Sequence, residues 1–448
     1  MPQKVGFLGF IAYSVSLNEL VVFNGYLTVE SGVITRMGLR EEFESLKYSG
    51  SLSGFNIKYM GTNQILIPGF VDCHTHAPQF PNIGLGLDKP LMEWLDKYTF
   101  PLERRYSDLQ FAADVYTKVV KGLLKNGTTT VCYFGSLHLK GTLELVNSVI
   151  KCHQRALVGK VSMNMPNSAG YYNDTAKELK DTEDFVRRVR EKQRDLVQPV
   201  VTPRFAVSCD TELMTGLAKI ATRYACRIQS HISEHRDEVE YVLKTNPNCT
   251  SYSDVYDKCN ILNNQSIMAH AIHLTDDEIK LFAAKGVSVA HCPASNTRLR
   301  SGMCPVRKLL DNNIKVGLGT DISGGDNATL LDAMRRTMDV STHLEFHGGR
   351  PAINWKEAFY LATLGGAKVL GLDDKIGNFK IGKEFDALVV DIYADDSQLD
   401  NYDYPPEASD EERILNLLHR FLYVGDDRNI VEVYVKGKQL MMVVYDEN

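Results

Sequence analysis

The sequence lacks any CxxC pair, although it contains nine cysteines. An odd number of unpaired cysteines is not the pattern of a disulfide-stapled secreted domain, which uses an even set in a short chain. We therefore expect reduced thiols and a cytoplasmic protein.

Two further absences limit the partners of the chain. It has no excess of positive charge, since its formal net charge is −6, and this argues against a general nucleic-acid-binding face. It also has no apolar run of the ~18 residues that a membrane-spanning helix requires. Residues 5–15 resemble a short signal-peptide core, but no small-residue cleavage site follows, and the alternation after it favours strands. The expected partners are small molecules, with no nucleic acid and no membrane.

Both ends of the chain have the composition of strands. Residues 25–38 hold two β-rich runs joined by a Glu-Ser-Gly turn, which is the signature of a hairpin. Residues 385–391 and 430–445 have the same character. We predict a small β-sandwich built from residues 1–63 and residues 373–448, the second part including a C-terminal extension.

The middle of the chain alternates between short apolar strands and helices. Residues 108–127 have helical periodicity and end in Asn-Gly, a helix stop, and a strand follows at once. Strands that alternate with helices pair in parallel, so we predict an α/β fold with a (β/α)₈ TIM-type barrel over residues 64–372. An open doubly wound sheet is the alternative, but no GxGxxG follows the first strand. The eight strand candidates are residues 65–72, 128–134, 157–163, 199–205, 227–232, 266–272, 287–293 and 314–321.

Histidines and carboxylates follow the predicted barrel strands at the points where the strands end. In such barrels the carboxyl ends of all strands meet at one face, where the chemistry collects. We therefore expect these polar side chains to lie close together. In chain order they are His74, His76, His231, Glu234, His270 and Asp321.

The side chains of His74 and His76 should point in one direction, because residues i and i+2 of a strand share a side. With His231 and Asp321 they form an N₃O donor set that suits Zn²⁺, although iron accepts the same ligands. A water in the remaining position would ionise near pH 7. The alternative is that these histidines are hydrogen-bonded core residues, but so many unpaired buried imidazoles would be costly to desolvate.

Two more residues of the barrel allow a chemical and a structural interpretation. Lys160 could be a carbamylated lysine that bridges two metals, but it lies too early in its strand, so we expect it at the surface or at the amino-terminal face. His291 ends the seventh strand, and we expect it to make a structural hydrogen bond.

Several blocks of the sequence resemble the guanine deaminase family of the amidohydrolase superfamily. PGFVDCHTHAPQ is similar to the first metal motif of the superfamily. The blocks particular to guanine deaminases are LMEWLDKYTFP, KNGTTTVCYF, VTPRFAVSC, QSHISEHRDEVE, AHCPASN, GLGTDISGG and FLYVGDDRNIVEVYV. One departure is His235, where the family more often has asparagine, and this residue should point away from the metal.

The resemblance implies a role for each candidate residue. Glu234 would be the proton shuttle, and His270 would contact the metal-bound hydroxide. Gln79 and Arg204 would contact the purine, and Phe205 would stack on it or belong to the core. One zinc ion per chain would be held by His74, His76, His231 and Asp321, and Asp321 would also accept the proton of the water.

The implied reaction is the hydrolytic deamination of guanine to xanthine and ammonia by a cytoplasmic homodimer, with guanine and water as its small-molecule partners. The other zinc deaminase signature, HxE followed by PCxxC, is absent. Two alternatives stay open: deamination of another amino-heterocycle, such as a triazine, cytosine or adenosine-like compound, and a non-catalytic scaffold of the same fold.

Overall fold

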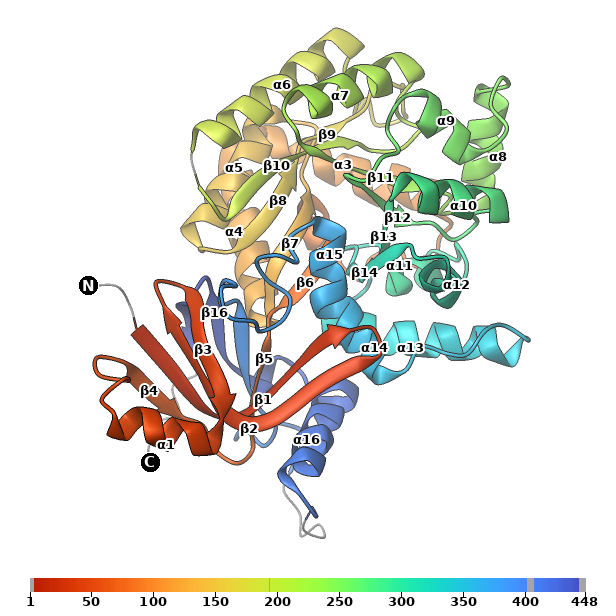
Figure 1. Cartoon of the computed structure of the whole chain (residues 1–448). Coiled ribbons are helices and arrows are strands. Elements are labelled where there is room, and N and C mark those ends of the chain that lie inside the picture. The colour runs from red at the N-terminus through yellow and green to blue at the C-terminus, as the bar shows by residue number, and fades with distance from the viewer. Residues whose placement is uncertain (1–3, 193, 401–406, 443–448) are drawn as a thin grey trace.

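The chain is organised by two sheets that meet side by side (Figure 1). A computed structural model of the chain describes residues 4–192, 194–400 and 407–442. One sheet is a barrel of parallel strands interleaved with helices, and the other is a mixed sheet formed by the two ends of the chain. The predicted α/β class, with a TIM-type barrel and an added β unit, is confirmed.

Eight parallel strands run around the barrel in the order of the chain, unlike the strands of a doubly wound sheet. The ring nearly closes where the last strand returns to the first, because the Asp321 N–H donates to the His74 carbonyl over 2.9 Å. A short extra strand, β9 (Val161–Ser162), pairs with β10. The eight strands are β6 (Phe70–His76), β7 (Thr128–Phe134), β8 (Arg155–Gly159), β10 (Val197–Pro203), β11 (Arg227–Ile232), β12 (Ser266–His270), β13 (Ser288–His291) and β14 (Lys315–Leu318).

Helices connect these strands and cover the segments between them. The α-helices of the barrel segment are α2 (Leu91–Trp94), α3 (Phe100–Glu103), α4 (Leu109–Lys125), α5 (Leu139–Lys151), α6 (Thr175–Glu191), α7 (Thr211–Arg223), α8 (Arg236–Thr245), α9 (Tyr252–Lys258), α10 (Asp276–Lys285), α11 (Pro293–Arg298), α12 (Val306–Asp311), α13 (Leu330–Phe346), α14 (Trp355–Tyr360) and α15 (Gly366–Leu370). Shorter or wider turns form η1 (Ala77–Asn82), η2 (Leu95–Thr99), η3 (Arg104–Ser107) and η4 (Leu361–Gly365).

Helix α4 illustrates how the sequence sets these elements. The Asp108 carboxylate accepts hydrogen bonds from the N–H groups of Gln110 and Phe111, which caps the amino end. Its apolar residues recur at helical spacing and are buried. The helix ends before Gly127, which has φ +77° and turns the chain into strand β7. The predicted helix and its stop are confirmed.

A layer of apolar side chains fills the barrel below the polar face. Residues of six strands contribute to this layer, and helix α15 packs on it with Ala367, Val369 and Leu370. The strand residues are Val71, Cys73, Cys132, Leu157, Val200, Ile267 and Ala290. The barrel is therefore a filled core, which supports the polar residues at the carboxyl ends of its strands.

The second sheet joins the two ends of the chain, with strand order β17-β16-β15-β5-β1-β2-β3 and β4 paired to β1. Helices α1 (Arg40–Tyr48) and α16 (Asp410–Val424) and the turn η5 (Asp427–Asn429) accompany it. The predicted hairpin and terminal strands are present as far as Met442; the predicted end of the last strand lies outside the described residues. The strands are β1 (Lys4–Ser16), β2 (Glu19–Glu30), β3 (Val33–Leu39), β4 (Asn56–Tyr59), β5 (Gln64–Pro68), β15 (Ala387–Asp391), β16 (Ile430–Val435) and β17 (Lys438–Met442).

The predicted first barrel strand, residues 65–72, is in fact divided between the two sheets. Strand β5 pairs with β1 and β15 of the terminal sheet, and only β6 belongs to the barrel. Gly69 joins them at a point where a Cβ would lie 2.2 Å from Oγ1 of Thr129. The sequence predicts one strand here because both halves of the run are apolar, as buried strands are. The domain boundaries at residues 63 and 372 stay a prediction, and we propose Gly69 as the first crossing point.

A buried ion-pair cluster connects the barrel to the terminal sheet. Arg155, at the start of β8, donates from Nε and Nη2 to the two carboxylate oxygens of Asp386 over 2.8 and 3.0 Å. Its Nη2 also donates to Glu384 over 2.7 Å. The Asp386 carboxylate additionally accepts the Lys436 N–H, so the strand β15, the β16–β17 turn and β8 share one charge cluster. The planar guanidinium of arginine can donate to both carboxylates at once, which the ammonium group of lysine cannot do with the same geometry.

We expect Arg155→Ala to lower the free energy of unfolding by about 3–5 kcal/mol, because it leaves the buried Asp386 carboxylate without its cation, while Glu384 keeps only the longer ion pair with Lys436 Nζ at 3.4 Å. Arg223→Ala is the matched control, since the Arg223 side chain pairs with Glu183 but is 64% exposed, and its loss should cost under ~1 kcal/mol. Urea denaturation measures both. Equal, small losses in the two variants would contradict a stabilising role for the Arg155 cluster.

Candidate active site

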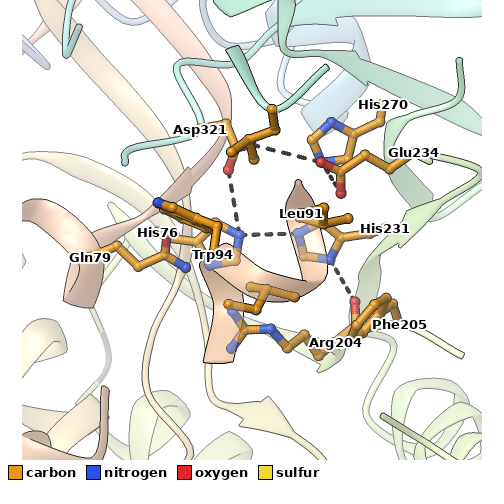
Figure 2. Close-up of a pocket in the computed structure, with 12 residues that line it drawn as sticks. His76, Gln79, Leu91, Trp94, Arg204, Phe205, His231, Glu234, His270 and Asp321 are labelled. Atoms are coloured by element: carbon orange, nitrogen blue, oxygen red, sulfur yellow. Dashed lines mark hydrogen bonds and ion pairs between the residues drawn. The ribbon is translucent and has the colours of Figure 1, made fainter. Parts of the chain in front are cut away.

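The predicted site residues meet at the carboxyl ends of the barrel strands (Figure 2). His74 and His76 end strand β6, His231 lies in β11, and His270 is the last residue of β12. Asp321 follows β14, and all of these side chains are buried. The predicted convergence of residues from four strands is therefore present.

The nitrogen and oxygen atoms that would bind a metal point at one another. His74 Nε2 lies 3.2 Å from Asp321 Oδ1, and His76 Nε2 lies 3.6 Å from the same oxygen. His76 Nε2 is 3.1 Å from His231 Nε2. The two histidines of β6 thus face one point, as their i, i+2 spacing predicts. The N₃O set is assembled, while its role as a ligand set stays a proposal.

The hydrogen bonds around these imidazoles suit a cation. His231 Nδ1 lies 2.6 Å from the Arg204 carbonyl, an acceptor only, so the proton is on Nδ1 and a lone pair is on Nε2. That lone pair faces His76 Nε2, and two lone pairs at this distance repel unless a proton or a metal ion lies between them. Among the described residues, His74 Nε2 has no hydrogen-bond partner, and the nearby Asp321 Oδ1 lies 3.2 Å from it. The donors present therefore fit a divalent metal.

Other donor combinations lie within reach of one another in the same place. One joins His74, His231 and His270, and another joins His270, Cys292 and Asp321. The second is chemically poorer, because burial and then the nearby carboxylates raise the pKa of the Cys292 thiol well above its usual value, and only a thiolate binds metal well. His74, His76 and Asp321 form a third combination, and His231 Nε2 lies 3.1 Å from His76 Nε2 beside it.

The two carboxylates of the site have opposite protonation tendencies. Burial by itself would raise the pKa of Asp321, but the neighbouring imidazoles, His74 first, hold it well below its usual value. Burial raises the pKa of Glu234 well above its usual value, and repulsion from Glu238 and Asp321 adds to this. A neutral acid and an ionised carboxylate side by side are the arrangement that acid–base catalysis uses.

Glu234 and His270 are each held by a second polar residue. The Glu238 carboxylate accepts the N–H groups of Glu234 and His235 over 2.8 and 3.1 Å, which fixes the backbone beside the acid. His270 Nδ1 lies 2.8 Å from Asn296 Oδ1, and its Nε2 lies 3.4 Å from Glu234 Oε2. The imidazole is therefore aimed at the acid and away from bulk solvent.

The backbone at these strand ends is bent into an uncommon conformation. Ser233, His270 and Asp321 have φ values of +47°, +72° and +47°, in the left-handed region that residues with a side chain seldom adopt. Such conformations cost of order 1–3 kcal/mol each and persist where the surroundings fix them. Here they turn the polar side chains of three strand ends toward one centre.

A cavity lies beside the cluster, and its two ends differ. Figure 2 shows Glu234, His270 and Asp321 at one end and Gln79 and Arg204 at the other. Apolar side chains complete the lining, namely Leu91, Trp94, Leu95, Phe205 and Leu299. Gln79 and Arg204 were predicted to lie here, and Phe205 both lines the cavity and is buried.

No pattern in the sequence singles out Glu103. This residue ends helix α3, in a run of charged residues that otherwise reads as surface, yet it is fully buried. Its carboxylate binds both Gln79 and Arg204. Burial alone would lower the pKa of Arg204, but the Glu103 carboxylate raises it. Leu91, Trp94 and Leu95 belong to the block LMEWLDKYTFP, but nothing in its sequence predicts that these side chains line the cavity.

The structure also places three residues for which we expected no catalytic role, namely Lys160, His291 and His235. Lys160 was expected at the surface or the amino-terminal face, but it is fully buried, and its ammonium donates to Glu178 over 2.6 Å. His291 was expected to make a hydrogen bond, and this was wrong: neither ring nitrogen has a partner in the part of the chain that the structure describes. His235 accepts the Asp237 N–H at the start of α8 and does not line the cavity.

Taken together, one end of the cavity has donor atoms that fit a cation, an acid with a raised pKa and a carboxylate with a lowered pKa, and the other end has the hydrogen-bond donors of Arg204. This combination suits hydrolysis at a carbon atom of a planar, polar ring. The apolar side chains between the two ends would contact the faces of such a ring.

Comparisons with known proteins agree with this arrangement. Residues 65–440 match the Amidohydrolase family, whose members are metal-dependent. Guanine deaminase of Dictyostelium discoideum is 42% identical over 97% of this chain and 97% of its own, and that of Homo sapiens is 44% identical over 92% and 90%. The crystal structure of guanine deaminase from C. acetobutylicum with bound guanine in the active site superimposes with a TM-score of 0.87 at 36% identity, covering 98% of this chain and 100% of the other. The chain therefore belongs to the amidohydrolase family, in the branch of the guanine deaminases.

Proposed function

We propose that the chain catalyses the hydrolytic deamination of guanine, which yields xanthine and ammonia. The observation that supports this most is the polarity of the cavity, with a protonated acid, Glu234, at the cation site and the Arg204 guanidinium at the other end. Guanine has an amine to lose at C2 and a carbonyl acceptor at C6, so it matches both ends. The guanine deaminases to which the chain is similar support the same substrate.

We further propose one Zn²⁺ per chain, bound by His74, His76, His231 and Asp321. Three imidazoles and one carboxylate suit zinc, and iron is the alternative that the same donors would accept. When bound, such an ion supplies Lewis acidity, so that a water molecule ionises near pH 7. Asp321, which stays ionised, accepts the proton that this water loses.

Glu234 moves protons between the water, the ring and the leaving group. It starts protonated because burial raises its pKa, and it donates to ring N3 as the water oxygen bonds to C2. The proton that Asp321 took from the water then passes through the Glu234 carboxylate to the exocyclic nitrogen, the C2–N bond breaks, and ammonia leaves. The C2 hydroxyl gives its proton back to the Glu234 carboxylate, which restores the acid and leaves the second carbonyl of xanthine.

His270 stabilises the negative charge that develops on the attacking oxygen. Nδ1 lies 2.8 Å from Asn296 Oδ1, which orients the ring, and Nε2 lies 3.4 Å from Glu234 Oε2 and 3.8 Å from Asp321 Oδ2. A proton on Nε2 would point toward the place where this oxygen develops its charge. At the other end, Arg204 and Gln79 donate to the C6 carbonyl, and Phe205 packs on the ring.

The two alternatives left open by the sequence are not favoured. A scaffold that has lost catalysis has no reason to keep a complete donor set and a buried acid together, and both are present here. A substrate with an amine in place of the C6 carbonyl would put donors against the Arg204 guanidinium, which has no acceptor.

A cytoplasmic homodimer remains our proposal for the state of the protein in the cell. All nine cysteines are free thiols, which agrees with a reducing compartment. Over the described residues, no helix has the length and apolar character needed to cross a bilayer. Sedimentation of the purified protein tests the dimer.

Incubation of the purified chain with guanine, adenine, cytosine and a melamine-like triazine should release ammonia from guanine. A chelator should abolish the release, and Zn²⁺ should restore it, because no other group in the cavity can ionise water near pH 7 as a metal does. Elemental analysis should find about one zinc per chain. Release from another substrate and none from guanine would overturn the proposed function, and full activity in chelator would overturn the metal.

Glu234→Gln should keep zinc but lower kcat by about 10²–10⁴, since the amide preserves the shape and removes the proton transfer. Glu240→Gln is the control, because Glu240 lies on helix α8, shortly after Glu234 in the chain, but is exposed. Steady-state kinetics with metal analysis of each variant makes the comparison. A Glu234→Gln enzyme with nearly wild-type kcat would show that another group shuttles the proton.

A further inference from the structure

Glu103 is a fully buried carboxylate that lies behind the cavity rather than in it. Its Oε1 accepts from Gln79 Nε2 over 3.0 Å and from Arg204 Nη2 over 3.2 Å, and its Oε2 accepts from Arg204 Nη1 over 2.7 Å. It is 0% exposed and is not among the residues that line the cavity. Glu103 therefore contacts both residues of the purine-binding end but cannot contact the purine itself.

An ionised carboxylate accepts hydrogen bonds and cannot donate them. Paired with the Arg204 guanidinium, Glu103 therefore requires that Gln79 present its NH₂ group, which fixes the orientation of this amide. The amide oxygen of Gln79 is then turned toward the Ser323 N–H, 3.4 Å away. Gln79 then has one N–H available for a ligand, and Arg204 has the N–H groups that do not bind Glu103.

We propose that Glu103 sets the hydrogen-bonding polarity of the purine pocket, holding Gln79 and Arg204 so that this end offers donors only. The pocket would then select purines with a carbonyl oxygen at C6 and reject those with hydrogen or an amine there. This inference rests on the proposed function and adds the group that decides the substrate class. Glu103 is a positioning residue, since it acts through Gln79 and Arg204.

A purely structural role makes a different prediction. If Glu103 only neutralises a buried guanidinium, its loss lowers stability and weakens every purine to a similar extent. If it sets the polarity, its loss lets the Gln79 amide rotate and present its oxygen, and the penalty falls on ligands with a C6 carbonyl. A pair of ligands that differ at this edge separates the two.

The test compares guanine with 2-aminopurine, which keeps the C2 amine but lacks the C6 oxygen and the N1 proton. Guanine is followed by its KM and kcat, and 2-aminopurine by its competition constant against guanine, which is defined whether or not it reacts. For Glu103→Gln we expect the guanine KM to rise about tenfold or more while the 2-aminopurine constant changes less than about threefold. The preference for guanine thus falls about tenfold.

Two further variants keep the result interpretable. Glu178→Gln removes another buried carboxylate, paired with Lys160 and outside the cavity lining, and should leave the ligand ratio as in the wild type. Glu103→Asp keeps an acceptor-only anion one methylene shorter, so it should weaken guanine but retain the preference. If Glu103→Gln does not fold, the polarity model requires that Glu103→Asp keep the preference, and loss of preference in that variant overturns it.

Other outcomes are decisive as well. Equal weakening of guanine and 2-aminopurine in Glu103→Gln, or no change in either, would overturn the inference and leave the proposed function intact. If wild-type protein released no ammonia from guanine, the proposed function would fail first, before any variant was compared.

Discussion

The Asp321 carboxylate and the imidazoles that surround it are the interaction on which the site and the closure of the barrel both depend. The Asp321 N–H donates to the His74 carbonyl, so the bond that brings β14 back to β6 also places the carboxylate beside the first two histidines. The lone pair of His231 Nε2 and the Asp321 carboxylate, both buried among the other imidazoles, would stabilise a cation between them. A metal ion at this point would relieve the repulsion and lock the ring of strands.

The cavity is organised by polar residues one step removed from it. Glu238 fixes the backbone of Glu234, Asn296 fixes His270, and Glu103 fixes Gln79 and Arg204. The Arg204 carbonyl in turn holds the His231 ring. Arg204 therefore joins the proposed purine-binding end, through its side chain, to the proposed metal-binding end, through its carbonyl.

Much of this was readable from the sequence, because it follows from local rules. Eight apolar strands separated by helical periodicity predict the barrel, and polar residues at the ends of three of those strands predict the cluster of His74, His76, His231 and Asp321. What the sequence could not show depends on packing between distant segments. Strands β5 and β6 read as one run because both are buried, although they belong to different sheets. Glu103 reads as one more charged residue in Leu-Glu-Arg-Arg, and only the fold brings Arg204 to it.

We propose that a single metal ion lies between the imidazoles of His74, His76 and His231 and the carboxylate of Asp321. Anomalous diffraction from crystals of the zinc-loaded protein, recorded on both sides of the zinc edge, can locate this ion. We expect one strong peak within coordination distance, about 2.0–2.2 Å, of all four side chains. No peak there, or a peak at His270 and Cys292 instead, would contradict it.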